Sequence, residues 1–423
     1  MAKARKLTQA IRDDIIDLDA HGRKQEDIAA TLGVSQGTVS RVLRAYNKNE
    51  AEPVVIDARS RAFLNQYRDL PAVPKRVLAT KREDMGFDTP QEAVALFSDL
   101  HYGSRIDRRA TGGLAEYNID LARERLTEWR NSLLRLHQLN SLVIKIPRLN
   151  IFALGDDLEG HGAMFGSQAL QMETNVLFQQ MGFVEDMTNV ILAFTARYPA
   201  ISIYKVYGNH GRIAPKSRDS YGPDNLELFA WDQIASRVQL ALAKDGVEPG
   251  VRTESRNGII QITGGKVDFH ITPAFFIRVM IRGQEFFARH GHMIGGLQQT
   301  YTGAIGNKLT MDSVIGKVIP YYLKAHLHEA QSAEAQIGGE IIQNGCFVGP
   351  SLLSVERNRA SASLPSQEFY LVHPRKGLTH HHRIHLATPD GIRNSEVIVD
   401  SQALLYDAGD ADVNETPVVF DVA

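Results

Sequence analysis

The sequence has 423 residues, 43% hydrophobic and 23% charged, which is ordinary for a globular protein with more than one domain. Its single cysteine, Cys346, excludes an internal disulfide framework and fits a reducing compartment. No apolar stretch reaches the roughly 18–20 residues of a membrane span, and the N-terminus lacks the apolar core of a secretory signal. We therefore expect a cytoplasmic protein without membrane contact. Because the net charge is −2, any nucleic-acid contact must rest on local basic patches.

The first predicted elements are three short helices within residues 7–46. The segment QEDIAATLGVSQGTVSRVLRAY resembles bacterial and phage helix-turn-helix domains. Gly33 stands where the turn needs a positive φ, and Ser35 is a suitable N-cap for the second helix. The side chains expected to face a DNA groove are Gln36, Thr38, Ser40, Arg41 and Arg44. The alternative is a three-helix bundle used for protein contact or dimerisation.

Residues 49–90 mix charges with four prolines and show no sustained periodicity, which is typical of a linker. We therefore expect a helical domain at 1–48, a second domain at 91–390 and a C-terminal extension at 391–423. Within the second domain, His380–His382 lies in an alternating segment. We interpret this segment as a strand. The alternative is a histidine tract that binds metal.

From residue 91 onward, five apolar runs end in polar residues of a similar kind. Helical patterns at 117–139 and 168–198 separate the first three runs, which favours a largely parallel sheet packed under helices. Ligands bind beyond the carboxyl ends of strands in such sheets, so these polar side chains should converge. They are Asp99 and His101, then Asp156, then Asn209 and His210, then His290, and finally His326 with His328.

This set contains more metal-ligating side chains than one zinc ion uses, which is about four. It suits two metals about 3.5–4 Å apart with a bridging carboxylate. Imidazole together with carboxylate and amide oxygen favours manganese, iron or zinc over magnesium or calcium. We expect two divalent metal ions, with manganese preferred and iron or zinc left open.

The ordered series SDLH, GDDLE, GNHG, HG and AHLH resembles the signature of the calcineurin-like metallophosphoesterases. That signature is Asp-x-His, Gly-Asp-x-x-Asp/Glu, Gly-Asn-His-Asp/Glu, a lone His and Gly-His-x-His. The match extends over about 230 residues, from Asp99 to His328. The resemblance implies an α/β sandwich of two mixed β-sheets flanked by helices, with a dinuclear metal centre that activates water to hydrolyse phosphate esters.

The resemblance also implies a role for each matching residue. Asp99, His101 and His328 would hold the first metal, Asn209, His290 and His326 the second, and Asp156 would bridge them. His210 would lie beside the substrate phosphate and assist the leaving oxygen, and Gly208 would let the chain turn sharply into the site. His292 remains an alternative to His290.

The sequence departs from the signature at two positions. Gly211 replaces the acidic residue that usually orients the histidine, which leaves the orientation of His210 unexplained. Ala325 replaces the first glycine of Gly-His-x-His, a mild change that a loop can absorb.

Three features favour DNA as the substrate. The first is the helix-turn-helix pattern. The second is a set of basic residues after the motifs, which would hold flanking phosphates unless they are only a solvated loop surface. These are Arg105, Arg108, Arg109, Arg212, Lys216 and Arg218, and Arg105, Arg109 and Arg212 are the preferred substrate contacts. The third is the stretch IIQNGCFVGPSLL followed by SQEFYLVHPRKG, which resembles phage-borne phosphoesterases akin to the SbcD-type nuclease subunit.

We therefore predict a metal-dependent DNA nuclease of a bacterial or phage-infected cell, with exonuclease or endonuclease action left open. A homodimer and an ATPase partner also stay open. The alternative is a nucleotide or protein phosphomonoesterase or cyclic phosphodiesterase that uses its N-terminal helices for assembly. A DNA-binding regulator with a degenerate metal site is the weakest reading, because every expected ligand is present.

Overall fold

The structure is a computed structural model that describes residues 7–47, 89–111, 115–162, 168–214, 222, 224–292, 301–335, 339–350 and 364–387. The chain divides into two compact units, Met1–Ala79 and Thr80–Ala423. Most of the predicted linker and the whole predicted C-terminal extension lie outside the described residues, and so do Lys216 and Arg218.

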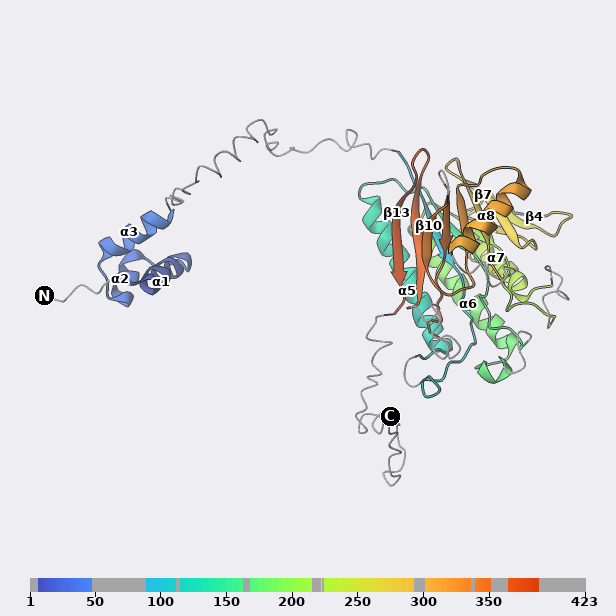
Figure 1. The fold of residues 1–423 in the computed structure, drawn as a ribbon, viewed down its shortest axis with the longest axis horizontal. Coiled ribbons are helices and arrows are strands. Elements are labelled where there is room, and N and C mark those ends of the chain that lie inside the picture. Colours follow the sequence, from blue (N-terminus) through green and yellow to red (C-terminus); the bar gives the residue numbers. More distant parts are fainter. Residues whose placement is uncertain are drawn as a thin grey trace, which may run out of the picture. The chain divides into compact units, whose positions relative to one another are not determined.

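The first unit contains the three predicted helices, α1 (Gln9–Ala20), α2 (Gln25–Leu32) and α3 (Gln36–Asn47) (Figure 1). α2 ends at Gly33, whose φ of 64° is the left-handed conformation that the turn was expected to need. Ser35 accepts a hydrogen bond from the backbone N–H of Thr38 at 3.2 Å, as a capping residue does. The small core consists of Ile15, Ile28, Ala29, Val39 and Leu43. Its use in DNA binding stays a prediction.

The second unit contains two mixed sheets. The first has the strand order β13-β12-β1-β2-β3-β6-β5-β4, and the second has the order β10-β11-β9-β8-β7. β1, β2, β3 and β6 run parallel, and β8 runs parallel to β9. The strands are β1 (Glu92–Phe97), β2 (Arg148–Ala153), β3 (Ala200–Lys205), β4 (Val251–Glu254), β5 (Ile260–Thr263), β6 (Val267–Ile271), β7 (Phe276–Ile281), β8 (Gln284–Arg289), β9 (Tyr321–Lys324), β10 (Gln331–Glu334), β11 (Glu340–Gln343), β12 (Ser366–His373) and β13 (Gly377–His385).

Among the described residues, five helical elements accompany the sheets: α5 (Ile119–Ser141), the 3₁₀ helix η2 (Gln168–Gln171), α6 (Val176–Thr195), α7 (Leu226–Lys244) and α8 (Tyr301–Ile315). Asn118, Asn175 and Asn225 cap α5, α6 and α7, each accepting a backbone N–H from the first turn. The cap at Asn175 divides the predicted helical pattern at 168–198 into η2 and α6, since an N-cap residue leaves the helical conformation.

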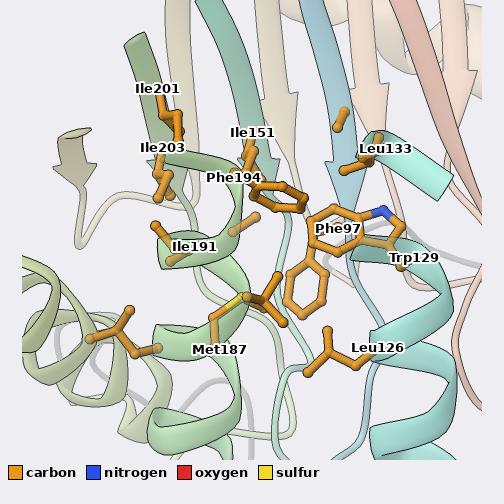
Figure 2. Packing of buried hydrophobic residues seen from close by; sticks show 14 of the residues in the cluster. Phe97, Leu126, Trp129, Leu133, Ile151, Met187, Ile191, Phe194, Ile201 and Ile203 are labelled. Carbon is orange, nitrogen blue, oxygen red and sulfur yellow. The ribbon is translucent and has the colours of Figure 1, made fainter. Parts of the chain in front are cut away.

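The elements stack in four layers, so the predicted α/β sandwich of two mixed sheets flanked by helices is confirmed (Figure 1). The largest hydrophobic cluster lies between the eight-stranded sheet and α5, α6 and α7. Figure 2 shows part of it, where the Phe97 and Trp129 rings meet with centroids 5.2 Å apart. A second cluster joins the two sheets, and a third joins the five-stranded sheet to α8. The metal-ligand candidates therefore follow strands on both sides of the central interface.

Two further expectations can be checked against the fold. His380–His382 lies inside β13, so the strand interpretation is confirmed, and no group of possible metal ligands among the described residues includes these histidines. Cys346 is a buried free thiol. Among the described helices, none combines the length and hydropathy that crossing a bilayer requires.

Candidate metal centre

The polar residues that follow β1, β2, β3, β8 and β9 converge at one end of the two sheets. Among the described residues, three groups place possible ligand atoms within 4.8 Å of one another. These groups are Asp99, His101 and His328, then Asp156, His290 and His326, and finally His101, Glu159 and His210. The first two groups contain six of the seven predicted metal ligands, and the seventh, Asn209, adjoins the second.

The first group is Asp99, His101 and His328. The Nε2 atoms of His101 and His328 lie 3.1 Å apart, and Asp99 Oδ1 lies 3.3 Å from His328 Nε2. Asp99 is fully buried, and its Oδ1 accepts no hydrogen bond from the described residues. A buried carboxylate oxygen facing two imidazole nitrogens is the donor set that a divalent cation prefers, so these residues fit a metal ion.

The second group surrounds His290. Its Nε2 atom lies 2.9 Å from Asp156 Oδ2, 3.0 Å from Asn209 Oδ1 and 3.2 Å from His326 Nδ1. Its Nδ1–H donates to the carbonyl oxygen of Leu154 at 2.9 Å, which leaves Nε2 free to bind a metal. Asp156 also lies 4.0 Å from His101 Nε2, so its carboxylate faces both groups as a bridging ligand would.

His292, the alternative to His290, is in none of the three groups. Burial and the charge of His290 lower the pKa of the His292 imidazole to about 3. The ring centroids of His292 and His290 are 5.4 Å apart. The geometry favours His290, and the individual ligand assignments stay predictions.

The ligand backbones are strained. Six non-glycine residues in the described part of the chain have a positive φ, and five of them are predicted ligands: Asp99 at 55°, His101 at 47°, Asp156 at 56°, His326 at 77° and His328 at 61°. Such conformations cost about 1–3 kcal/mol each and concentrate at functional sites. This coincidence supports the site independently of the side-chain distances.

The chain bends at Asn209 and turns at His210–Gly211, directly after Gly208, which itself does not have a positive φ. A Cβ atom built at Gly208 would lie only 2.1 Å from Asp156 Oδ1. The close approach of the loop after β3 to the carboxylate of Asp156 therefore requires a glycine here, in addition to the turn.

Glu159 orients two histidines, a role that the sequence did not reveal. Its Oε2 accepts the Nδ1–H of His101 at 3.0 Å and lies 3.6 Å from His210 Nδ1. The carbonyl oxygen of Glu159 lies 3.1 Å from the same His210 nitrogen. Gln168 holds Glu159 in turn, since its Nε2 donates to the Glu159 carboxylate at 2.8 Å. The available signal was the last residue of GDDLE, which occupies the Asp/Glu position of the signature.

The position of Glu159 also accounts for Gly211. A Cβ at Gly211 would lie 2.4 Å from Asn225 Oδ1, so no acidic side chain fits there. Burial alone would lower the pKa of His210, but the negative charges of Asp156 and Glu159 outweigh it and raise that pKa to about 9. The charges of Asp156 and Glu159 thus favour the protonated imidazole, which is the form that can donate a proton.

A buried ion network of Lys205, Asp157 and Glu227 lies beside the centre, and all three residues are 0% exposed. Lys205 forms ion pairs with Asp157 and, at 2.9 Å, with Glu227. Glu227 also accepts the backbone N–H of Asp157 at 3.1 Å and of Gly208 at 3.0 Å. This single carboxylate thus connects the loop after β2 to the loop after β3. A lysine inside the apolar run SIYKVY was the sequence signal for it.

The remaining candidate residues lie on surfaces. Arg105 and Arg109 are exposed, and Arg212 is half-buried. Burial lowers the pKa of Arg212 while the charge of Asp156 opposes this, so Arg212 lies within electrostatic reach of the centre. On α3, Gln36, Arg41 and Arg44 are exposed and Thr38 and Ser40 are partly exposed. Their contacts with substrate or DNA stay predictions.

Comparison with known proteins gives only distant similarity. No protein-family model matches the chain, and no curated protein matches it. Among solved structures, a dimetal phosphatase from Danio rerio aligns over 70% of this chain and 100% of its own, with 9% identity and a TM-score of 0.31. A calcineurin-like phosphoesterase from Bacillus subtilis aligns over 75% and 99%, with 9% identity and a TM-score of 0.28. A 5'-nucleotidase from Candida albicans aligns over 73% and 55%, with 11% identity and a TM-score of 0.27. Because similarity at this level says nothing about function, the function must be argued from the site.

Proposed function

We propose that the second unit is a metal-dependent hydrolase that cleaves phosphodiester bonds in DNA. One observation carries this proposal: two groups of candidate ligand side chains face the carboxylate of Asp156, and His210 lies beside that carboxylate and beside His101. Two bound divalent cations would neutralise phosphate oxygens and lower the pKa of the attacking water. Asp99, His101 and His328 would hold one ion, Asn209, His290 and His326 the other, with manganese the preferred metal.

His210 supplies the proton that the leaving oxygen needs. Its backbone N–H donates to Asp156 Oδ1 at 2.9 Å, which fixes the residue next to the bridging carboxylate. Glu159 accepts from its imidazole and keeps it charged, so the proton on the opposite ring nitrogen can go to the substrate. Arg105, Arg109 and Arg212 would contact the phosphates on either side of the scissile one.

The choice of DNA is supported by the first unit. α3 contains no acidic residue and exposes Arg41 and Arg44, whereas α1 carries four aspartates against one arginine and α2 carries two acidic residues and no basic one. Of these three helices, α3, the one expected in a DNA groove, is the one with a net positive charge. The first unit would raise the local concentration of DNA around the catalytic unit through tethering.

A cleavage assay in manganese tests the proposal. Labelled single-stranded, duplex and nicked DNA would be incubated with the full chain and with the variant Asp156→Asn, alongside bis(p-nitrophenyl) phosphate. Asp232→Asn is the matched control, because Asp232 pairs with Arg252 away from the ligand groups. We expect DNA cleavage by the native chain and the control and none by Asp156→Asn. Hydrolysis of the small ester without cleavage of any DNA would refute the choice of substrate.

A variant without residues 1–48 tests the tethering. It should lose affinity for duplex DNA and the salt dependence of that affinity, while it keeps its rate on the small ester. An unchanged affinity would refute the DNA-binding role of the first unit.

A further inference from the structure

Two buried cations lie side by side at the ends of β8 and β9. Ala288 pairs with Leu323 in the parallel register of these strands, so the next residues, Arg289 and Lys324, are neighbours. Arg289 is 6% exposed and Lys324 is 5% exposed. Within the part of the chain that the structure describes, no Asp or Glu lies within ion-pair distance of either of them, although the charge of Glu329 acts on Lys324 from further away. The segments 293–300 and 336–338, outside that part, contain no acidic residue.

The strand pattern defines the surface that these cations occupy. Side chains alternate along a strand, so Arg289 and Lys324 lie on the same face as Phe287 and Tyr322, two residues earlier. Those two rings stack with centroids 4.8 Å apart in the cluster that includes α8. The Arg289 guanidinium donates to the Tyr322 hydroxyl at 3.3 Å and lies 5.5 Å from the centre of the Phe275 ring.

The contacts of Arg289 leave part of its hydrogen-bonding capacity unused. Its Nε–H is buried and has no hydrogen-bond partner among the described residues. A buried cation without a counter-ion is costly, and leaving a donor of a charged group unsatisfied adds to that cost. Two such cations next to each other also repel one another. An anion bound between them would satisfy the free donor and remove the repulsion.

The pair adjoins the metal centre along the chain. His290 follows Arg289 directly, and His326 lies two residues after Lys324. A Cβ built at Gly291 would lie 3.8 Å from His326 Cβ and 3.9 Å from Lys324 Cβ, so the lysine side chain starts beside the turn that follows His290. Arg289 and Lys324 lie on the α8 face of the sheet, but the charge of Arg289 acts on His292, whose ring centroid is 5.4 Å from that of His290. An anion held by the pair would therefore lie near the end of the sheet that carries the candidate metal centre.

We propose that Arg289 and Lys324 form a phosphate-binding subsite, which holds a second phosphate group of the substrate next to the one that is cleaved. Guanidinium and ammonium groups together are the side chains that proteins use to bind phosphate. The identity of the ligand as part of the substrate rests on the proposed function. The binding of a phosphate anion by the pair does not, since it needs neither metal nor hydrolysis.

The first experiment measures phosphate binding without metal. Thermal unfolding of the full chain would be followed in EDTA, with inorganic phosphate or with sodium chloride of equal ionic strength. The variants are Arg289→Met and Lys324→Met. The matched control is Lys317→Met, which removes an exposed lysine paired with Glu285 on β8. We expect phosphate to raise the Tm of the native chain and of the control by on the order of 3 °C, and to leave both cation variants unchanged.

An equal rise in all four proteins, or no rise in the native chain, would overturn the proposal. If Arg289→Met does not fold, the response of Lys324→Met to phosphate tests the proposal by itself. Methionine keeps most of the aliphatic part of the lysine side chain and lacks the ammonium group.

The second experiment separates a substrate phosphate from free phosphate. kcat/KM would be compared for a thymidine dinucleotide with a terminal phosphate, at its 5′ or its 3′ end, and for the same dinucleotide without it. We expect the native chain to prefer one phosphorylated form about tenfold and Lys324→Met to lose that preference, whereas the control Lys317→Met keeps both the preference and the rate on bis(p-nitrophenyl) phosphate.

A preference that persists in Lys324→Met, or its absence in the native chain, would overturn the substrate role. If no dinucleotide or DNA is cleaved but phosphate still stabilises only the proteins that keep both cations, the proposed function fails and the anion site stands.

Discussion

Replacing Glu227 with glutamine should separate metal binding from fold stability. Glu227 is fully buried and accepts three hydrogen bonds, from Lys205 Nζ and from the backbone N–H groups of Asp157 and Gly208. The amide nitrogen of glutamine cannot accept, so at least one buried donor loses its partner. Leaving a buried donor unsatisfied costs about 1–3 kcal/mol. Lys205 keeps Asp157 as its counter-ion, which avoids the larger cost of an unpaired buried ammonium.

We therefore expect the free energy of unfolding of Glu227→Gln to fall by about 2–3 kcal/mol, and its Tm by about 4–8 °C. The larger effect should be on metal affinity, because Glu227 connects the loops that carry Asp156 and Asn209. Changes in residues that hold metal ligands in place typically cost 10–100-fold in affinity. Titration of the metal-free chain with Mn²⁺ in a calorimeter measures this affinity directly.

A control of similar instability is available on the same helix. Leu242→Ala lies 15 residues further along α7, about 22 Å from Glu227, and should cost about 2–5 kcal/mol through a cavity. It should bind Mn²⁺ as the native chain does. If Glu227→Gln also kept its Mn²⁺ affinity within about twofold, or if both variants lost affinity equally, the network would be ordinary core structure and our reasoning would be wrong.

Two further predictions concern the candidate site, and a third concerns α3 of the first unit. In Glu159→Gln, His210 loses a carboxylate that raises its pKa. Because His210 acts when protonated, activity is lost as the pH rises through that pKa, so the alkaline limb of the pH–rate profile should move to lower pH. An unmoved limb would exclude His210 as the acid. Gly208→Ala would place a Cβ 2.1 Å from Asp156 Oδ1 and should abolish Mn²⁺ binding, measured by calorimetry, whereas Gly306→Ala, with no atom within 4 Å of the new Cβ, should not. Replacing both Arg41 and Arg44 with alanine should weaken binding to duplex DNA. It should also reduce the slope of the logarithm of the binding constant against the logarithm of the salt concentration by about 2, whereas Arg23→Ala should leave that slope unchanged.

The fold could be predicted, and the candidate metal ligands could be located, because both depend on local patterns. Apolar runs identify strands, and in a parallel arrangement the residues after each strand meet at one end. Asp99, Asp156 and Asn209 were found in this way, although they are far apart in the chain. The same reasoning reached His290 and His326, because β8 and β9 are also parallel and end at the same interface.

The missed features all depend on contacts between distant segments. Glu159 was only the last residue of the motif GDDLE and had no assigned role. Its role can be assigned only from the contacts that it makes with His101 and His210. Glu227 lies in a helix that no motif marks. The reason for Gly208 is the proximity of Asp156, which no pattern in the run VYGNHG can indicate. Sequence patterns thus identify the groups that carry the chemistry, and contacts identify the groups that hold them.

The strained ligand backbones need a compensating source of free energy, and the structure contains one. After β1 and β2 end, their loops continue to pair: Asp99 N–H donates to Gly155 O at 3.0 Å, and His101 N–H donates to Asp156 O at 2.9 Å. The Phe347 N–H, from a third segment, donates to Asp99 O at 3.0 Å. These bonds satisfy buried backbone groups in an unfavourable conformation, and the core beneath them keeps the strands fixed. The sheets and the loop pairing therefore hold the candidate ligands in place, so metal affinity should follow the integrity of the loop pairing.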